Sequence, residues 1–215
     1  YNYKELFKEL KKDGFQFRGY SDTEVLLNSY LKWGINCLEH LRGMFAFVIW
    51  NKKEKKLFGA RDRLGIKPLH YMIDEKNNFF FSSEIKALLP FLKEKRANPI
   101  LTRQYLQWNI LDHDLENTMI ENVKKIPPGY FFTWDMSGLF KKIKYWDLQS
   151  YDFDLPKEKS IQYYIDNFRE NFDKTINLHL RSDVDIGTSL SGGLDSSTIV
   201  CSLRDQLSKK NNSSL

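Results

Sequence analysis

The spacing of apolar residues predicts several helices along the chain. Positions three and four apart carry apolar side chains in stretches that end at glycine, proline or polar residues. This spacing places the apolar side chains on one helical face. The predicted helices run from Tyr3 to Asp13, Ser21 to Gly34, Ser83 to Leu89, Pro99 to Leu111 and Ile161 to Leu180, and another begins at Thr198.

Strands are predicted between these helices. Met44 to Trp50 is a continuous apolar run, as expected for a strand covered on both faces. Its hairpin partner is Leu57 to Asp62, after a polar tip. Further strands are predicted at Phe15 to Phe17, Pro68 to Ile73, Asn78 to Phe81, Tyr130 to Trp134, Leu139 to Trp146 and Val184 to Leu190. Residues 43 to 82 are therefore strand-rich, with helices before and after.

Composition narrows the class of protein. The chain has 215 residues, of which 41% are hydrophobic, enough for one or two domains with a packed core. Its net charge of +5 is spread over short lysine groups, so a solvated surface is expected and no nucleic-acid partner. No membrane span or signal peptide is expected, and Cys37 and Cys201 are interpreted as buried thiols in the cytoplasm.

The ends of the chain predict that it is a piece of a longer protein. It begins at Tyr1, without Met and already close to a helix. It ends one helix after a glycine-rich loop at residues 189 to 197. A single strand, loop and helix cannot enclose a ligand, so we expect the remaining parts of any binding site at this loop to lie outside this sequence.

The glycine-rich loop itself suggests anion binding. Gly192 and Gly193 allow positive φ and a close approach of the backbone. The free N–H groups at the start of the following helix favour phosphate oxygens. Ser191, Ser196 and Ser197 can donate hydroxyl protons, and Asp195 can hold a hard cation. The loop lacks the Gly-Lys-Ser/Thr ending of a Walker loop.

This loop resembles the Ser-Gly-Gly-x-Asp-Ser loop of the ATP pyrophosphatases, which cleave ATP to AMP and pyrophosphate. The resemblance implies an ATP and pyrophosphate site, with Mg²⁺ on Asp195, and it rests on Leu190, Ser191, Gly192, Gly193, Leu194, Asp195, Ser196 and Ser197. The plain alternative is a serine- and glycine-rich turn that binds nothing.

A second resemblance covers most of the remaining chain. The motifs that carry it are Gly43-Met44-Phe45-Ala46-Phe47, Ala60-Arg61-Asp62-Arg63-Leu64-Gly65-Ile66-Lys67-Pro68-Leu69 and Ser83-Glu84-Ile85-Lys86-Ala87-Leu88. They resemble the class II glutaminase domain, and their order before the glycine-rich loop resembles the glutamine-hydrolysing asparagine synthetase family.

The resemblance implies a fold class and a domain division. Residues 1–154 are expected to form an α+β N-terminal-nucleophile (αββα) glutamine amidotransferase domain that lacks its N-terminal part. Residues 155–215 are expected to begin an α/β ATP-pyrophosphatase domain of the adenine nucleotide α-hydrolase-like type. The junction is expected in the charged segment Asp152 to Lys159.

The chain departs from the family at the nucleophile. The family uses an N-terminal cysteine activated by its own α-amine, whereas residue 1 here is Tyr, and no catalytic residue is assigned in this fragment. The Asn-Gly-Glu segment expected before Tyr1 is also missing. Asp22 is the one glutamine-binding residue that the resemblance carries over, and its plain alternative is an acidic residue that suits the helix dipole.

Other residues that look chemical are interpreted as structural. We expect a buried ion pair among Arg61, Asp62 and Arg63 that orders the turn at Gly65. The four histidines lack ligand spacing, so no metal site is expected from them.

The resemblance implies an ATP-dependent carbon–nitrogen ligase that uses glutamine as its amide donor. The expected reaction joins ammonia from glutamine to aspartate through an aspartyl-adenylate and releases AMP and pyrophosphate. The expected ligands are glutamine, aspartate, ATP and Mg²⁺, and a homodimer is one option. Two alternatives stay open: a related ligase with another acceptor, such as a β-lactam synthetase, and a non-catalytic scaffold.

Overall fold

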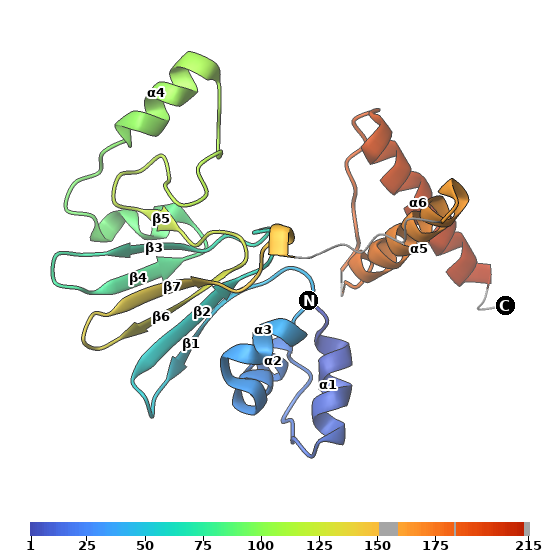
Figure 1. The fold of residues 1–215 in the computed structure, drawn as a ribbon, viewed down its shortest axis with the longest axis horizontal. Helices are drawn as coiled ribbons and strands as arrows, with labels where there is room; N and C mark the ends of the chain where they lie inside the picture. Colours follow the sequence, from blue (N-terminus) through green and yellow to red (C-terminus); the bar gives the residue numbers. More distant parts are fainter. Residues whose placement is uncertain (151–158, 183, 213–215) are drawn as a thin grey trace. The chain divides into compact units, whose positions relative to one another are not determined.

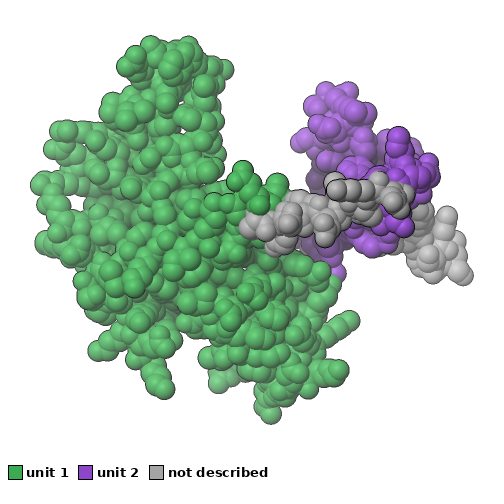
Figure 2. All heavy atoms as spheres, in the orientation of Figure 1, with its two compact units in different colours: residues 1–152 green, residues 153–215 purple. Residues whose placement is uncertain are grey.

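The computed structural model describes residues 1–150, 159–182 and 184–212. The chain divides into two compact units, Tyr1–Asp152 and Phe153–Leu215, which are coloured separately in Figure 2. The junction expected at Asp152 to Lys159 lies outside the described residues except for Lys159.

Four α-helices belong to the first unit: α1 (Tyr3–Lys12), α2 (Asp22–Trp33), α3 (Cys37–His40) and α4 (Pro99–Trp108). Local signals fix their ends. In α4, the Asn98 side chain accepts from the N–H groups of Ile100 and Leu101, and Asn109 closes the helix in the left-handed conformation. The predicted helices at the start of the chain and at Pro99 are therefore confirmed.

Two antiparallel sheets form the centre of this unit (Figure 1). The first has the strand order β1 (Ala46–Asn51), β2 (Lys56–Arg61), β6 (Tyr130–Asp135) and β7 (Phe140–Lys144). The second has the order β4 (Phe79–Ser82), β3 (His70–Ile73) and β5 (Lys124–Lys125). The predicted hairpin of Met44 to Trp50 with Leu57 to Asp62 is confirmed, and the predicted strands that begin at Pro68, Asn78, Tyr130 and Leu139 form β3, β4, β6 and β7.

Alternating side chains of the strands fill three cores. Phe58 and Phe131 face helices α1 to α3, whereas Phe132 lies between the two sheets with Tyr71. Met72, next to Tyr71, faces the outer side of the second sheet. This period of two is what a strand covered on both faces requires. The layers follow the order helix, sheet, sheet, helical segment, as expected for the αββα fold (Figure 1).

Two local predictions in this unit are wrong. The segment Phe15 to Phe17 forms no strand, and the ring of Phe17 packs on Phe7 instead, with centroids 4.4 Å apart. The helix predicted from Ser83 to Leu89 is replaced by two 3₁₀ helices, Ile85–Ala87 and Leu89–Phe91, in which N–H groups donate to carbonyls three residues back, as from Leu88 to Ile85 at 2.9 Å. Two more 3₁₀ helices cover Gly34–Asn36 and Leu148–Ser150.

The second unit contains two long helices, α5 (Ile161–His179) and α6 (Leu194–Asn212). Gln206 of α6 donates from Nε2 to the backbone carbonyl of Asp173 at 3.0 Å, and Ser202 donates to the Asp173 carboxylate at 3.0 Å. The strand predicted from Val184 to Leu190 is not present, since the described part of this unit offers no partner strand for its hydrogen bonds.

Candidate functional site

A pocket of about 510 Å³ lies in the first unit between the start of α2 and strand β1. The α2 side is formed by Asp22, Thr23, Leu26 and Leu27. The opposite wall comes from the segment that runs into and along β1. Lys67, Pro68, Ser83 and Tyr1 complete the lining. A concave, mostly apolar pocket with a few polar groups is the usual form of a small-molecule site.

The structure places Asp22 in the lining of this pocket as the first residue of α2. Ser21 is the N-cap, and its hydroxyl oxygen accepts from the N–H of Thr23 at 3.2 Å. The Asp22 side chain is exposed, at the helix end where the dipole favours negative charge. An exposed carboxylate at the edge of a pocket can bind the ammonium group of a ligand.

Glu24, the third residue of α2, does not complete a regular capping box with Ser21. Its two carboxylate oxygens accept from the backbone N–H groups of Arg18 at 2.8 Å and Gly19 at 3.0 Å. In a regular capping box it would reach back to the N-cap residue itself. These two hydrogen bonds to the Glu24 carboxylate therefore hold the loop that leads into Ser21 and Asp22.

Tyr1 is a pocket residue that sequence reasoning did not single out. Its phenolic oxygen donates to the backbone carbonyl of Asp22. Burial, and next the charge of Asp22, raise the pKa of the Tyr1 phenol, which keeps it a proton donor at neutral pH. The partner lies 21 positions away in the sequence, so no local pattern could reveal the contact.

Lys67 and Pro68 reach the pocket because of a turn organised by Asp62, which is 1% exposed. Its carboxylate accepts backbone N–H groups from Leu64 at 3.2 Å, Ile66 at 3.0 Å and Lys67 at 2.9 Å. The N–H of Phe45, another pocket residue, donates to the same carboxylate at 3.3 Å. Four donors thus compensate one buried charge and join two walls of the pocket.

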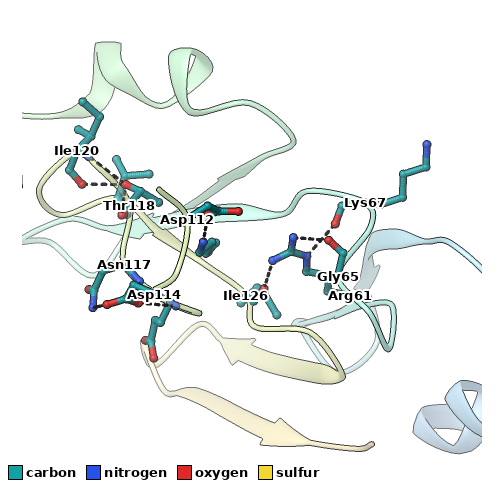
Figure 3. Close-up of polar contacts among 12 residues, drawn as sticks. Arg61, Gly65, Lys67, Asp112, Asp114, Asn117, Thr118, Ile120 and Ile126 are labelled. Carbon is teal, nitrogen blue, oxygen red and sulfur yellow. Dashed lines mark hydrogen bonds and ion pairs between the residues drawn. The ribbon is translucent and has the colours of Figure 1, made fainter. Parts of the chain in front are cut away.

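Arg61 holds the same turn from its other side (Figure 3). Its guanidinium donates to the backbone carbonyls of Lys67 at 2.8 Å, Ile126 at 2.7 Å and Gly65 at 2.6 Å. Gly65 has φ +66°, and a β-carbon there would lie 2.7 Å from Pro128. The expected ordering of this turn is confirmed, but the expected ion pair is wrong among the described residues, because both charges bind backbone groups instead.

In the second unit, the predicted loop residues are next to one another at the start of α6. The hydroxyl groups of Ser191 and Ser196 lie 2.9 Å apart, and Ser196 also donates to the Gly193 carbonyl at 3.2 Å. The N–H of Ser197 donates to the same carbonyl at 3.1 Å. Gly192 has φ +82°, and a β-carbon there would meet no heavy atom of the described residues within 4 Å. The loop thus leaves open space beside glycine backbone.

Asp195 lies in the first turn of α6, and Leu190 and Leu194 on either side of the glycines are exposed. Within residues 1–150, 159–182 and 184–212, no three His, Cys, Asp or Glu side chains form a metal-binding group. Mg²⁺ is commonly held by one or two carboxylates together with substrate phosphates and water. One carboxylate beside an open, glycine-rich loop fits that mode of binding.

The described helices include none that is long and apolar enough to cross a lipid bilayer.

Family profiles match both parts of the chain. The profile described as "Glutamine amidotransferase domain" matches residues 1–146. The profile described as "Asparagine synthase" matches residues 167–213.

Relatives with assigned names match most of the chain. The chain is 40% identical to the glutamine-hydrolyzing asparagine synthetase 3 of Bacillus subtilis, over 93% of this chain and 31% of that protein. It is 33% identical to "Amidase chry2" of Gibberella zeae, over 93% of this chain and 29% of that protein. The chain thus spans about a third of the length of these relatives.

Among solved structures, glutamine phosphoribosylpyrophosphate amidotransferase from B. subtilis resembles the chain with a TM-score of 0.47 and 21% identity. The match covers 67% of this chain and 27% of that one.

Proposed function

The chain belongs to the glutamine amidotransferase domain family, and from this membership we propose that it is part of a glutamine-hydrolysing asparagine synthase. In this proposal, ammonia is released from glutamine in a domain formed by residues 1–154. A domain that begins at residues 155–215 uses ATP to activate aspartate as an aspartyl-adenylate. The products are asparagine, AMP and pyrophosphate, and we place the reaction in the cytoplasm.

The observation that carries the proposal is the pocket lined by Asp22. The pocket is about 510 Å³, enough for an amino acid, and it presents one carboxylate on an otherwise largely apolar lining. We assign Asp22 to the α-ammonium group of glutamine. Neither Cys37, which is buried, nor any other described residue is assigned as the nucleophile.

The glycine-rich loop is proposed to bind ATP. The hydroxyl groups of Ser191, Ser196 and Ser197 and the backbone at Gly192 and Gly193 would hold the pyrophosphate portion. Leu190 and Leu194 flank the loop, and Leu190 would contact the adenosine through its backbone. Asp195 would hold Mg²⁺, which supplies charge neutralisation for the phosphate oxygens when bound. The fit rests on the open space at Gly192 and on the hydroxyl pair 2.9 Å apart.

A second candidate is a ligase of the same design with another acceptor. The relative named "Amidase chry2" matches 93% of the chain at 33% identity, and the asparagine synthetase matches an equal share. The matched region is therefore shared by relatives with different names. Aspartate consumption by the full-length protein, measured against other carboxylic acids, decides between the two.

The test of the glutaminase site uses the full-length protein with Asp22→Asn. Loss of one charge-assisted contact to the ammonium group is expected to raise the KM for glutamine by roughly tenfold or more. Ammonium chloride as nitrogen source is expected to bypass the defect. Asp13→Asn, at an exposed carboxylate outside the pocket lining, is the control. An unchanged KM for Asp22→Asn would remove the assignment.

The test of the ATP site is Asp195→Ala in the same protein, with pyrophosphate release as the measurement. Release is expected to fall to background, and higher Mg²⁺ concentrations are expected to restore part of it. Asp205→Ala, further along α6 and exposed, is the matched control. Normal release from Asp195→Ala would contradict the metal role.

A further inference from the structure

We propose that the Tyr1 phenol is a positioning residue that fixes the Asp22 carboxylate for the α-ammonium group of the substrate. This inference rests on the role of Asp22 proposed above. The Tyr1 hydroxyl donates to the backbone carbonyl of Asp22, and in this inference it acts on the substrate by way of the Asp22 carboxylate.

The hydrogen bond from Tyr1 is made to the backbone of the residue that carries the carboxylate. Asp22 is the first residue of α2, and its carbonyl accepts from the Tyr1 hydroxyl. The side chain of Asp22 projects from this same residue, with few bonds between the carbonyl and the carboxylate. Tyr1 and Asp22 both line the pocket, so the contact fixes the wall that carries the charge.

The other end of Tyr1 is anchored by its neighbour Asn2, which is 9% exposed. The Asn2 side chain donates to the His40 carbonyl at 3.1 Å and accepts from the Arg42 N–H at 2.7 Å. The Asn2 N–H donates to the Arg42 carbonyl at 3.0 Å. Three hydrogen bonds therefore hold the backbone at Tyr1 against residues 40–42.

The anchored segment leads directly into the opposite wall. Gly43 has φ +107°, and a β-carbon there would lie 3.1 Å from the α-carbon of Tyr1. Met44 and Phe45, which follow, line the pocket, and β1 begins at Ala46. Tyr1 thus spans the distance between the β1 wall, to which Asn2 ties it, and the α2 wall, which its hydroxyl reaches.

Glu24 also restrains the Asp22 carboxylate, by holding the loop that precedes it in the sequence. Its bonds to the N–H groups of Arg18 and Gly19 hold the loop before Ser21. The first turn of α2 is therefore held at both ends, by Glu24 through the loop and by Tyr1 through the helix. A carboxylate held in place loses less conformational freedom when a ligand binds.

The experiment compares two ligands in the full-length protein by titration calorimetry: L-glutamine, and glutaramate, which is glutamine without its α-amino group. Tyr1→Phe removes the hydroxyl and keeps the ring. It is expected to weaken glutamine binding about fivefold, which corresponds to one hydrogen bond, and to leave glutaramate binding within about twofold. Tyr3→Phe, outside the pocket lining, is the matched control and is expected to bind both ligands as the parent does.

Two further variants separate positioning from general support. Adding Tyr1→Phe to Asp22→Asn is expected to cause no further loss of glutamine binding, because Tyr1 acts through that carboxylate. Glu24→Gln loosens the same turn without touching Tyr1. It is expected to weaken the binding of glutamine but not of glutaramate. This variant tests the inference if Tyr1→Phe fails to fold.

Equal weakening of both ligands by Tyr1→Phe would overturn the inference and leave a structural role only. If Asp22→Asn weakens the binding of glutamine and Tyr1→Phe does not, the inference fails while the proposed function stands. If Asp22→Asn itself binds glutamine normally, the proposed role of Asp22 fails and the inference fails with it.

Discussion

The backbone N–H of Lys67 donates to the buried carboxylate of Asp62 at 2.9 Å and so bends the chain sharply after β2. The bend brings Lys67 into the lining of the pocket, which also includes Phe45. Because the N–H of Phe45 binds the same carboxylate, one side chain fixes two separate segments of the pocket.

Replacing this carboxylate by an amide is expected to be costly. In Asp62→Asn, one amide oxygen remains to accept, and the NH₂ group would face backbone donors. Leaving buried donors unpaired is expected to lower the free energy of unfolding by about 3 kcal/mol. Urea unfolding measures this loss. Asp74→Asn is the matched control, since Asp74 binds backbone N–H groups of a surface turn, and a loss of similar size there would contradict the role of burial.

Gly59 of β2 is expected to tolerate no side chain. It pairs with Phe132 of β6, and a β-carbon at Gly59 would lie 2.3 Å from Cε1 of that fully buried ring. Gly59→Ala is therefore expected to lower the free energy of unfolding by about 2 kcal/mol. Adding Phe132→Leu is expected to recover part of this loss in the Gly59→Ala background. At Gly19 the nearest atom would be 3.9 Å away, so Gly19→Ala is the control.

Cys37 is expected to resist thiol reagents in the folded protein. Burial raises the pKa of its thiol to about 12, and the side chain is fully buried. At pH 8 only about one thiol in ten thousand is then ionised, and the thiolate is the reactive form. Mass spectrometry after iodoacetamide treatment is expected to find Cys37 unmodified in the native protein and modified in urea. Modification at equal rates in both would contradict its burial.

Asp114 gives a dependence of stability on pH. Hydrogen bonds from Asn117, first from its side chain and then from its backbone, lower the pKa of Asp114 to about 2 from 3.8. A lowered carboxylate pKa means that the stabilisation is fully present above about pH 4 and is lost as the pH falls through about 2. The difference in unfolding free energy between the parent and Asp114→Asn is expected to shrink over that range. Asn117→Ala is expected to raise the pKa of Asp114 in an NMR titration, and an unchanged pKa would contradict this cause.

Sequence patterns predicted the hairpins because their information is local. The apolar run ending at Trp50 and its partner beginning at Leu57 lie on either side of a polar tip, and they pair with Trp50 opposite Leu57. The residues from Ser191 to Ser197 were likewise predicted as a turn before a helix, and the structure has a bend at Gly192 and Gly193 followed by α6, which begins at Leu194 and not at the predicted Thr198. Contiguity made these predictions possible.

Where the sequence failed, a distant or missing partner decided the outcome. Arg61 and Asp62 are adjacent and opposite in charge, yet backbone groups as far along the chain as Ile126 satisfy them. Tyr1 showed no pattern that points to Asp22. Val184 to Leu190 has the composition of a strand, but a strand forms only where a neighbour accepts its hydrogen bonds.

The pairing of β2 with β6 has a consequence for synthesis of the protein. Between these neighbouring strands the chain contains the whole second sheet and α4. On the ribosome, β1 and β2 can pair as soon as they emerge, but the outer edge of β2 must wait for Tyr130 and the residues after it. At roughly 5–20 residues per second, that wait lasts several seconds. During this time the edge at Leu57 and Phe58 is open to pairing with other chains, and early pairing there would block the place that β6 takes in the folded sheet.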